Sequence, residues 1–183
     1  MAPATVPDDV LVKVSTEGLK PLAADFTLLI WSASTGFVSD YYHALQSRRN
    51  TISTFYIPPP SMQVGKPILT IIFNGRVLQN GASVQAMFEN EMPQTRYEAQ
   101  SIDCQILNPQ YTPEGGVSHS RSAASTMTIL VIVSGAVRFS EDRNDPERQF
   151  SETFVLVPNQ DRGPRGQRPK DFLIQSQNFR VVV

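Results

Sequence analysis

Cysteine and histidine are scarce in this chain of 183 residues, which has one cysteine and two histidines. Because Cys104 is alone, no disulfide can form within the chain, and a reducing compartment is expected. His43 and His119 are far apart and form no metal-ligand motif with Cys104, and the thiol has no basic neighbour in sequence to activate it. No metal, cofactor or thiol chemistry is therefore predicted.

Three further absences narrow the class of protein. The formal net charge is only −1, so a nucleic-acid contact would have to come from a local patch. No apolar run approaches the roughly 18 residues needed to cross a bilayer, and the opening "MAPATVPDDV" lacks the features of a signal peptide. No glycine-rich phosphate loop follows a predicted strand. We therefore expect a soluble intracellular protein without a membrane partner, with a flexible tail over residues 1–15 and a single domain over 16–183.

The apolar pattern changes period along the chain. Spacings of three and four residues predict a helix up to about Leu45, kinked or interrupted at Gly36, and then a short helix that ends before "IPPP". "PILTIIFNG" predicts a strand that closes in a turn at Asn74-Gly75, and "GASVQAMFENEM" predicts a third helix. Four long strands follow, "TRYEAQSIDCQIL", "STMTILVIVSGAVRF", "RQFSETFVLVP" and "KDFLIQSQNFRVVV", joined by polar loops. The fold class is α+β, with helices on one face of a bent antiparallel sheet.

The run from Ser125 to Phe139 raises a question about its second face. Ile129, Val131 and Val133 are expected on one face, and Leu130 and Ile132 on the other, so that both faces are apolar. The helices can cover one face only. The other face is covered either by a partner molecule, the interpretation we favour, or by a sheet that curls around its own core.

The element order, with "STFYIPP" closing the helical section and "FVLVPN" and "DFLIQSQNFR" closing the chain, resembles the nuclear transport factor 2-like family. Within it the chain is most similar to the small subunits of the heterodimeric mRNA export receptor of fungi. The resemblance covers roughly Leu19 to the C-terminus. It implies a cone of three helices against a bent antiparallel sheet, and a large subunit that packs on the open sheet face. It also implies mRNA export through nuclear pores, contact with phenylalanine-glycine nucleoporins, and shuttling between nucleus and cytoplasm.

Partner-interface residues are predicted from the central strand and the last strand. They are Leu130, Val131, Ile132, Phe179 and Arg180, without the strand register that would decide which face meets the partner. A lone arginine among apolar residues commonly snorkels to water. The resemblance instead implies that Arg180 pairs with an acidic residue of the large subunit.

Two charged loops leave alternatives open. "DRGPRGQRPKD" presents Arg162, Arg165, Arg168 and Lys170, which are either RNA-contact candidates or a solvated linker. "SEDRNDPER" is acidic, as is the corresponding turn in a homodimeric carrier of Ran-GDP in the same family. Such a carrier is the first alternative function.

A small-molecule lyase or isomerase is the second alternative, because enzymes also use this fold. Its candidate groups would be His43, His119, Asp103 and Cys104, all of which are better explained as packing or solvated residues, and we predict no catalytic residue. The aromatic pair Phe55-Tyr56 is expected to plug the core.

Overall fold

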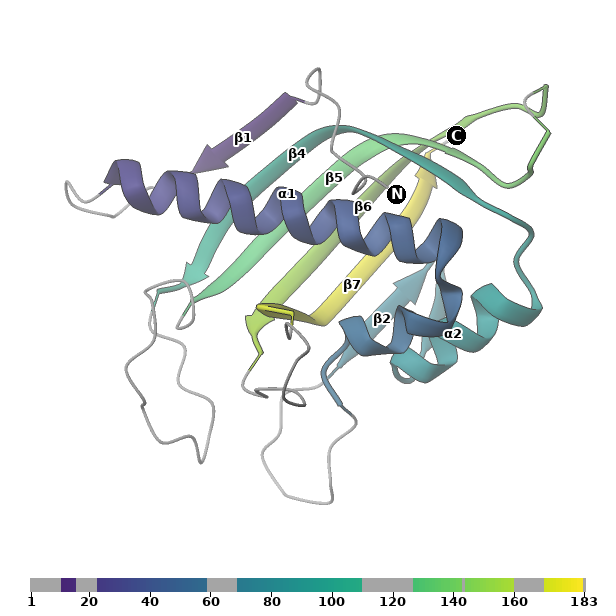
Figure 1. Cartoon of the computed structure of the whole chain (residues 1–183), viewed down its shortest axis with the longest axis horizontal. Coiled ribbons are helices and arrows are strands. Elements are labelled where there is room, and N and C mark those ends of the chain that lie inside the picture. Colours follow the sequence, from purple (N-terminus) through teal and green to yellow (C-terminus); the bar gives the residue numbers. More distant parts are fainter. Residues whose placement is uncertain are drawn as a thin grey trace.

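The computed structural model describes residues 11–15, 23–58, 69–109, 127–142, 144–159 and 170–182, with side chains described from residue 28 onward. A seven-stranded mixed sheet has the order β1-β4-β5-β6-β7-β2-β3. The helices lie on one side of this sheet, with α1 crossing β4 to β7 (Figure 1). This arrangement confirms the expected α+β cone.

Three helical segments form the layer above the sheet. Helix α1 (Ala23–Ser47) is continuous through Gly36, so the predicted kink is wrong. A single glycine costs a helix only about 1 kcal/mol, and the buried neighbours Phe37 and Val38 offset that cost by packing. The short 3-10 helix η1 (Arg49–Phe55) follows, as predicted before the prolines. No helix in the described part of the chain is both long enough and apolar enough to span a bilayer.

Four antiparallel strands make up the centre of the sheet: β4 (Arg96–Asn108), β5 (Thr128–Arg138), β6 (Arg148–Pro158) and β7 (Phe172–Val182). The β4–β5 register shifts between Ala99 and Ser101. Gly135 is required beside this bulge, because a Cβ there would lie 2.0 Å from the carbonyl oxygen of Glu98. Bulges bend the strands that carry them, and this one lies within the curved part of the cone.

Two strand pairs of the sheet are parallel, which sequence periodicity did not predict. β2 (Thr70–Phe73) pairs with β7 and turns at Asn74 (φ 48°) and Gly75 (φ 87°) into β3 (Arg76–Leu78), as two-residue hairpins require. β1 (Leu11–Ser15) pairs with β4. The expectation that the flexible tail extends to residue 15 is thus wrong for Leu11–Ser15, and residues 1–10 lie outside the described part.

Helix α2 (Gly81–Asn90) is joined to the other helices through Arg49. The side chain of Asn80 caps the N-terminus of α2 through the Ser83 amide at 2.8 Å. The guanidinium of Arg49 donates to the carbonyls of Phe88, Pro93 and Met92, the last at 2.8 Å, and to the Leu45 carbonyl near the end of α1. One cation therefore satisfies carbonyls at the C-terminal ends of two helices.

Replacing Arg49 with alanine is expected to lower the free energy of unfolding by about 2 kcal/mol, because several carbonyls lose a charged donor. Urea unfolding measures this value. Arg48→Ala is the matched control, since Arg48 is exposed, and its effect should stay within about 0.5 kcal/mol. Equal effects of the two substitutions would contradict the proposed role of Arg49.

Candidate functional site: the outer face of the sheet

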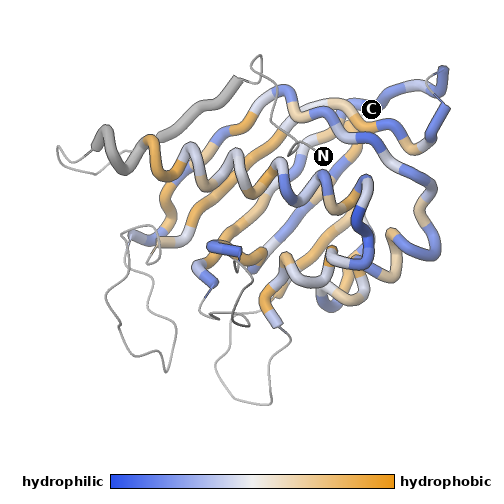
Figure 2. Tube along the Cα trace, viewed as in Figure 1, coloured by the Kyte–Doolittle hydropathy of each residue, from blue (hydrophilic) through white to orange (hydrophobic). Residues whose placement is uncertain are grey.

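The side of the sheet away from α1 is called the outer face here, and the register assigns its residues. Ile129, Val131 and Val133 are fully buried beneath the helical layer. Leu130 and Ile132 alternate with them and point to the outer face, as predicted. Figure 2 shows β5 as hydrophobic over most of its length, with hydrophilic stretches in β6 and β7 beside it.

Two cross-strand rows form the middle of the outer face. Each row follows the Cα pairing from β4 to β2. The first row is Gln105, Leu130, Val155, Ser176 and Thr70; the second is Asp103, Ile132, Thr153, Asn178 and Ile72. The side chain of Ile132 is 38% exposed. This face is thus a strip of aliphatic side chains between hydroxyl and amide groups, a composition that fits an interface better than a solvated surface.

Arg180 stands beside this strip. It pairs across the sheet with Ser151, which in turn pairs with Ser134, and its side chain is exposed. Neither salt bridge within the described residues involves Arg180. The guanidinium is therefore available to a carboxylate on a molecule that covers the outer face.

Two of the five predicted interface residues are on the wrong side of the sheet. Val131 and Phe179 are both fully buried in the core beneath the helices. Phe179 stacks on Phe73 with ring centroids 4.3 Å apart. A contact between either residue and a partner on the outer face is thus excluded, because in a strand only every second side chain reaches one face.

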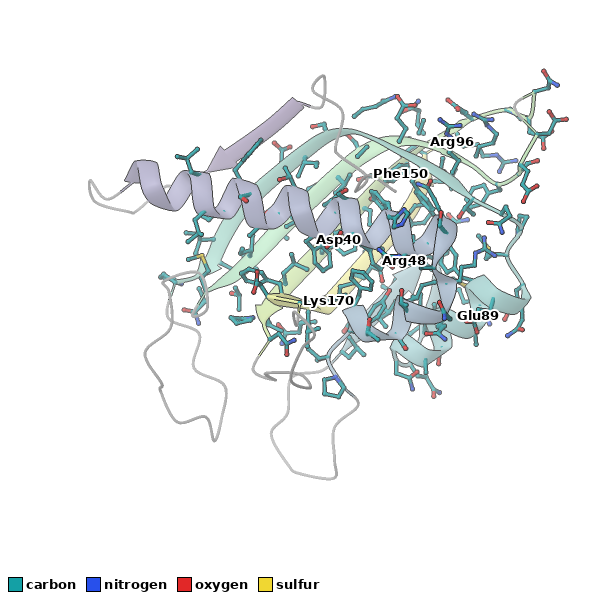
Figure 3. The ribbon with its side chains drawn as sticks, in the orientation of Figure 1. Asp40, Arg48, Glu89, Arg96, Phe150 and Lys170 are labelled. Atoms are coloured by element: carbon teal, nitrogen blue, oxygen red, sulfur yellow. The ribbon has the colours of Figure 1, made fainter. Side chains whose placement is uncertain are left out.

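Lys170 has local partners rather than an open path to phosphate. Its ammonium donates to the Thr54 hydroxyl at 2.8 Å and lies 4.1 Å from the centre of the Phe55 ring (Figure 3). Burial, opposed by Asp40, lowers the pKa of Lys170 from its ordinary value. The other cations of this loop, Arg162, Arg165 and Arg168, lie outside the described residues.

The acidic turn between β5 and β6 is mostly engaged in its own structure. Glu147 pairs with Arg138 at 2.5 Å, and Asp142 accepts a bond from the Asn144 amide at 2.9 Å. Glu141 and Asp145 are exposed. These contacts fit a solvated hairpin turn.

Aromatic side chains fill the interior of the cone. The ring of Tyr41 packs against Phe37, Phe55 and Phe154, and Phe150 packs against Tyr97 and Tyr42 behind α1 (Figure 3). Phe55 and Tyr56 are buried, as a core plug should be.

The residues proposed for the enzyme alternative do not come together. His43 is half-buried on α1, Asp103 is half-buried on the outer face, and His119 lies outside the described residues. Cys104 is buried, and burial raises the pKa of its thiol, which makes it less reactive. Among the described residues no group of three or more histidine, cysteine, aspartate or glutamate side chains could hold a metal ion.

A buried polar cluster was not predicted from the sequence. It consists of Tyr41, Tyr42, Tyr56, Glu152 and Gln177, which are all buried and hydrogen-bonded to one another. The signal was present in "FSETF", where Glu152 alternates with two buried phenylalanines and so shares their face.

Comparisons with known proteins agree with the cone-shaped fold. The family model described as "Nuclear transport factor 2 (NTF2) domain" matches residues 33–180. NTF2-related export protein 1 of Bos taurus is 26% identical over 125 residues, which cover 68% of this chain and 72% of the relative.

Two solved structures are also similar to this chain. A chain in the structure described as "Chaetomium thermophilum Mex67 NTF2-like domain complexed with Mtr2" matches at a TM-score of 0.65 and 24% identity, over 82% of this chain and 96% of that one. The "Structure of Mtr2" matches at a TM-score of 0.65 and 23% identity, over 84% and 99%. At these identities the two structures support the fold.

Proposed function

Because the chain belongs to the nuclear transport factor 2 family, we propose that it is the small, non-enzymatic subunit of a heterodimeric nuclear export receptor. Its partner is a larger subunit that covers the outer face with an NTF2-like domain of its own. The pair carries mRNA through nuclear pores, contacts phenylalanine-glycine nucleoporins, and shuttles between nucleus and cytoplasm.

The observation that carries this proposal is the outer face itself. Its aliphatic side chains are Leu130 and Val155, which pair across β5 and β6, Ile132 next to them on β5, and Ile72 farther away on β2. The helices cover the opposite face, so α1, η1 and α2 cannot cover this one (Figure 1). Among the similar proteins, one is named as an export protein, and Mtr2 forms a complex with the NTF2-like domain of Mex67.

A homodimeric carrier of Ran-GDP is the alternative within the same family. Size exclusion with light scattering distinguishes the heterodimer subunit from the homodimeric carrier, because it measures the molar mass of the purified chain. We expect the lone chain to be poorly soluble or aggregated, and to become a clean one-to-one complex when the large subunit is co-expressed. A stable, monodisperse homodimer of the lone chain would overturn the proposal.

The packing of the core argues against the enzyme alternative. Rings of α1, η1, β4 and β6 pack against one another where an enzyme of this fold would need space for substrate. Glu152 is the sole buried carboxylate in the described part of the chain, and it is hydrogen-bonded to two side chains of the protein.

RNA binding through the basic loop remains a proposal. Replacing Arg162, Arg165 and Arg168 with serine in the heterodimer should flatten the dependence of RNA affinity on salt, with about 0.7 lost from the slope per phosphate contact. Lys170→Ser is tested separately, and we expect a small effect because its ammonium is held by Thr54 and Phe55. Filter binding over a series of salt concentrations measures both. An unchanged slope in the triple variant would leave the solvated-linker interpretation.

A further inference from the structure

The buried polar cluster joins four elements of the fold. Tyr41 and Tyr42 come from α1, Tyr56 follows η1, Glu152 comes from β6 and Gln177 from β7. Glu152 is only 1% exposed, and in the sheet its Cα neighbours are Val133 and Phe179, both fully buried. A carboxyl group in such surroundings is costly to ionise unless its charge is compensated.

Hydrogen-bond directions can be assigned throughout the cluster. The Tyr42 hydroxyl donates to Oε2 of Glu152 at 2.8 Å. The side-chain amide of Gln177 donates to Oε1 of Glu152 at 2.6 Å and to the Tyr41 hydroxyl at 2.8 Å. Tyr56 donates to the amide oxygen of Gln177 at 2.5 Å, so the remaining proton of Tyr41 points to Tyr56, 2.7 Å away. Every proton has an acceptor, and Glu152 only accepts, which suits a carboxylate.

Burial opposes the ionised form of Glu152. The titratable groups that face Glu152 are four tyrosines: Tyr41 and Tyr42 of α1, Tyr56 after η1, and Tyr97 of β4. Burial raises the pKa of all four. The positive charge of Arg49 opposes the rise in the pKa of Tyr97. Burial raises the pKa of Glu152 from 4.5 to about 7, and the bonds from Gln177 and Tyr42 limit the rise. Near neutral pH the two protonation states are thus close in free energy.

We propose that this cluster is a proton switch, in which uptake of a proton by Glu152 ends the donation from the Tyr42 hydroxyl to the carboxylate, the charge-assisted bond that ties α1 to β6. A proton on Oε2 would meet the hydroxyl of Tyr42, whose own proton already points at the same oxygen. The hydroxyl must then rotate and accept instead of donating, while the ring stays stacked on Tyr97 at 4.9 Å. The switch follows from the fold alone and does not depend on which partner covers the outer face.

The first test measures the titration of Glu152 directly. In the complex with the co-purifying protein, with carbon-13 in this chain only, the side-chain carboxyl carbons are followed by NMR as a function of pH, and the signal lost in Glu152→Gln identifies Glu152. It should titrate near pH 7, and Tyr42→Phe should move the midpoint upward because the carboxylate loses a donor. A midpoint close to that of exposed glutamates, or a midpoint that Tyr42→Phe leaves unchanged, would overturn the proposal.

The second test uses urea unfolding at about pH 5 and about pH 8. The folded state holds one more proton than the unfolded state between the unfolded pKa of 4.5 and the folded pKa of about 7. This contribution to stability is therefore full at low pH and is lost as the pH rises through that window. Relative to Glu152→Gln, the unfolding equilibrium constant of the parent should rise by on the order of a hundredfold from the lower to the higher pH. Glu98→Gln, at an exposed position of β4, is the matched control and should keep the parent's profile.

The pH dependence of the effect of Tyr42→Phe on stability distinguishes the switch from a purely structural hydrogen bond. Tyr42→Phe should destabilise the protein at about pH 8, where the hydroxyl donates to the carboxylate, and much less at about pH 5, where only a weaker neutral bond with the protonated carboxyl is lost. In a Glu152→Gln background the effect of Tyr42→Phe should not depend on pH. A merely structural Tyr42 would cost the same at both pH values in both backgrounds, and that result would contradict the proposal.

Discussion

Replacing Ile132 with aspartate is expected to abolish co-purification of the large subunit. Ile132 lies in the second row of the outer face, between Asp103 and Thr153 in the register. Its side chain is 38% exposed. A partner sheet would bury the new carboxylate without a cation to pair with it. Stranding a buried charge costs about 3–5 kcal/mol. At 1.4 kcal/mol per tenfold, affinity should fall by roughly two to three orders of magnitude or more.

Leu28→Asp provides the matched control for this experiment. Leu28 is an aliphatic residue of α1 that is 64% exposed, on the helical side of the sheet. The control variant should bind the large subunit like the parent. Affinity is measured by calorimetry or by pull-down with titrated partner, and circular dichroism checks that both variants fold. Binding of Ile132→Asp within a few-fold of the parent would mean that the partner does not contact the middle of the outer face.

Replacing Arg180 with alanine is expected to cut the affinity for the large subunit by about two orders of magnitude. Its planar guanidinium suits bidentate pairing with a carboxylate, and it has no salt bridge among the described residues. Removing one partner of a buried pair costs about 3–5 kcal/mol, because the carboxylate left behind stays desolvated. Arg180→Lys should fall between alanine and the parent, since lysine keeps the charge without the planar fork.

Arg148→Ala is the control for Arg180, because Arg148 is also an exposed arginine, at the start of β6. It should leave the affinity unchanged. A charge swap, with Arg180→Glu on this chain and arginine in place of the partner's carboxylate, should recover part of the binding. If Arg180→Ala binds within a few-fold of the parent, Arg180 only snorkels to water and the pairing hypothesis is wrong.

The sequence predicted the fold well where local rules act. Alternation placed Leu130 and Ile132 opposite Ile129 and Val133, because side chains in a strand alternate between two faces. Asn74-Gly75 predicted a turn, since both residues tolerate positive φ. The continuity of α1 through Gly36 was missed, because tertiary packing outweighs a small intrinsic penalty.

Long-range pairing accounts for most of what the sequence did not predict. The parallel pairing of β1 with β4, and of β2 with β7, joins segments far apart in the chain, and no local pattern encodes it. For the same reason the face on which Val131 lies could not be chosen until the register was known. The bonds of Glu152 to Tyr42 and Gln177 span 110 and 25 residues, although the position of Glu152 among buried phenylalanines was readable.

The most direct test of the claim that a partner covers the outer face is the burial of a cysteine introduced at Ser134. Ser134 is exposed on that face in the row of Arg180, and Ser32 is exposed on α1, while the native Cys104 is buried. The rate of thiol labelling is measured for Ser134→Cys and Ser32→Cys in the isolated chain, diluted until light scattering shows no aggregate, and in the complex with the protein that co-purifies. We predict that complex formation slows labelling at position 134 by at least about tenfold, as burial of that face requires, and leaves position 32 unchanged. Equal labelling of Ser134→Cys in the free chain and in the complex would contradict this account of the outer face.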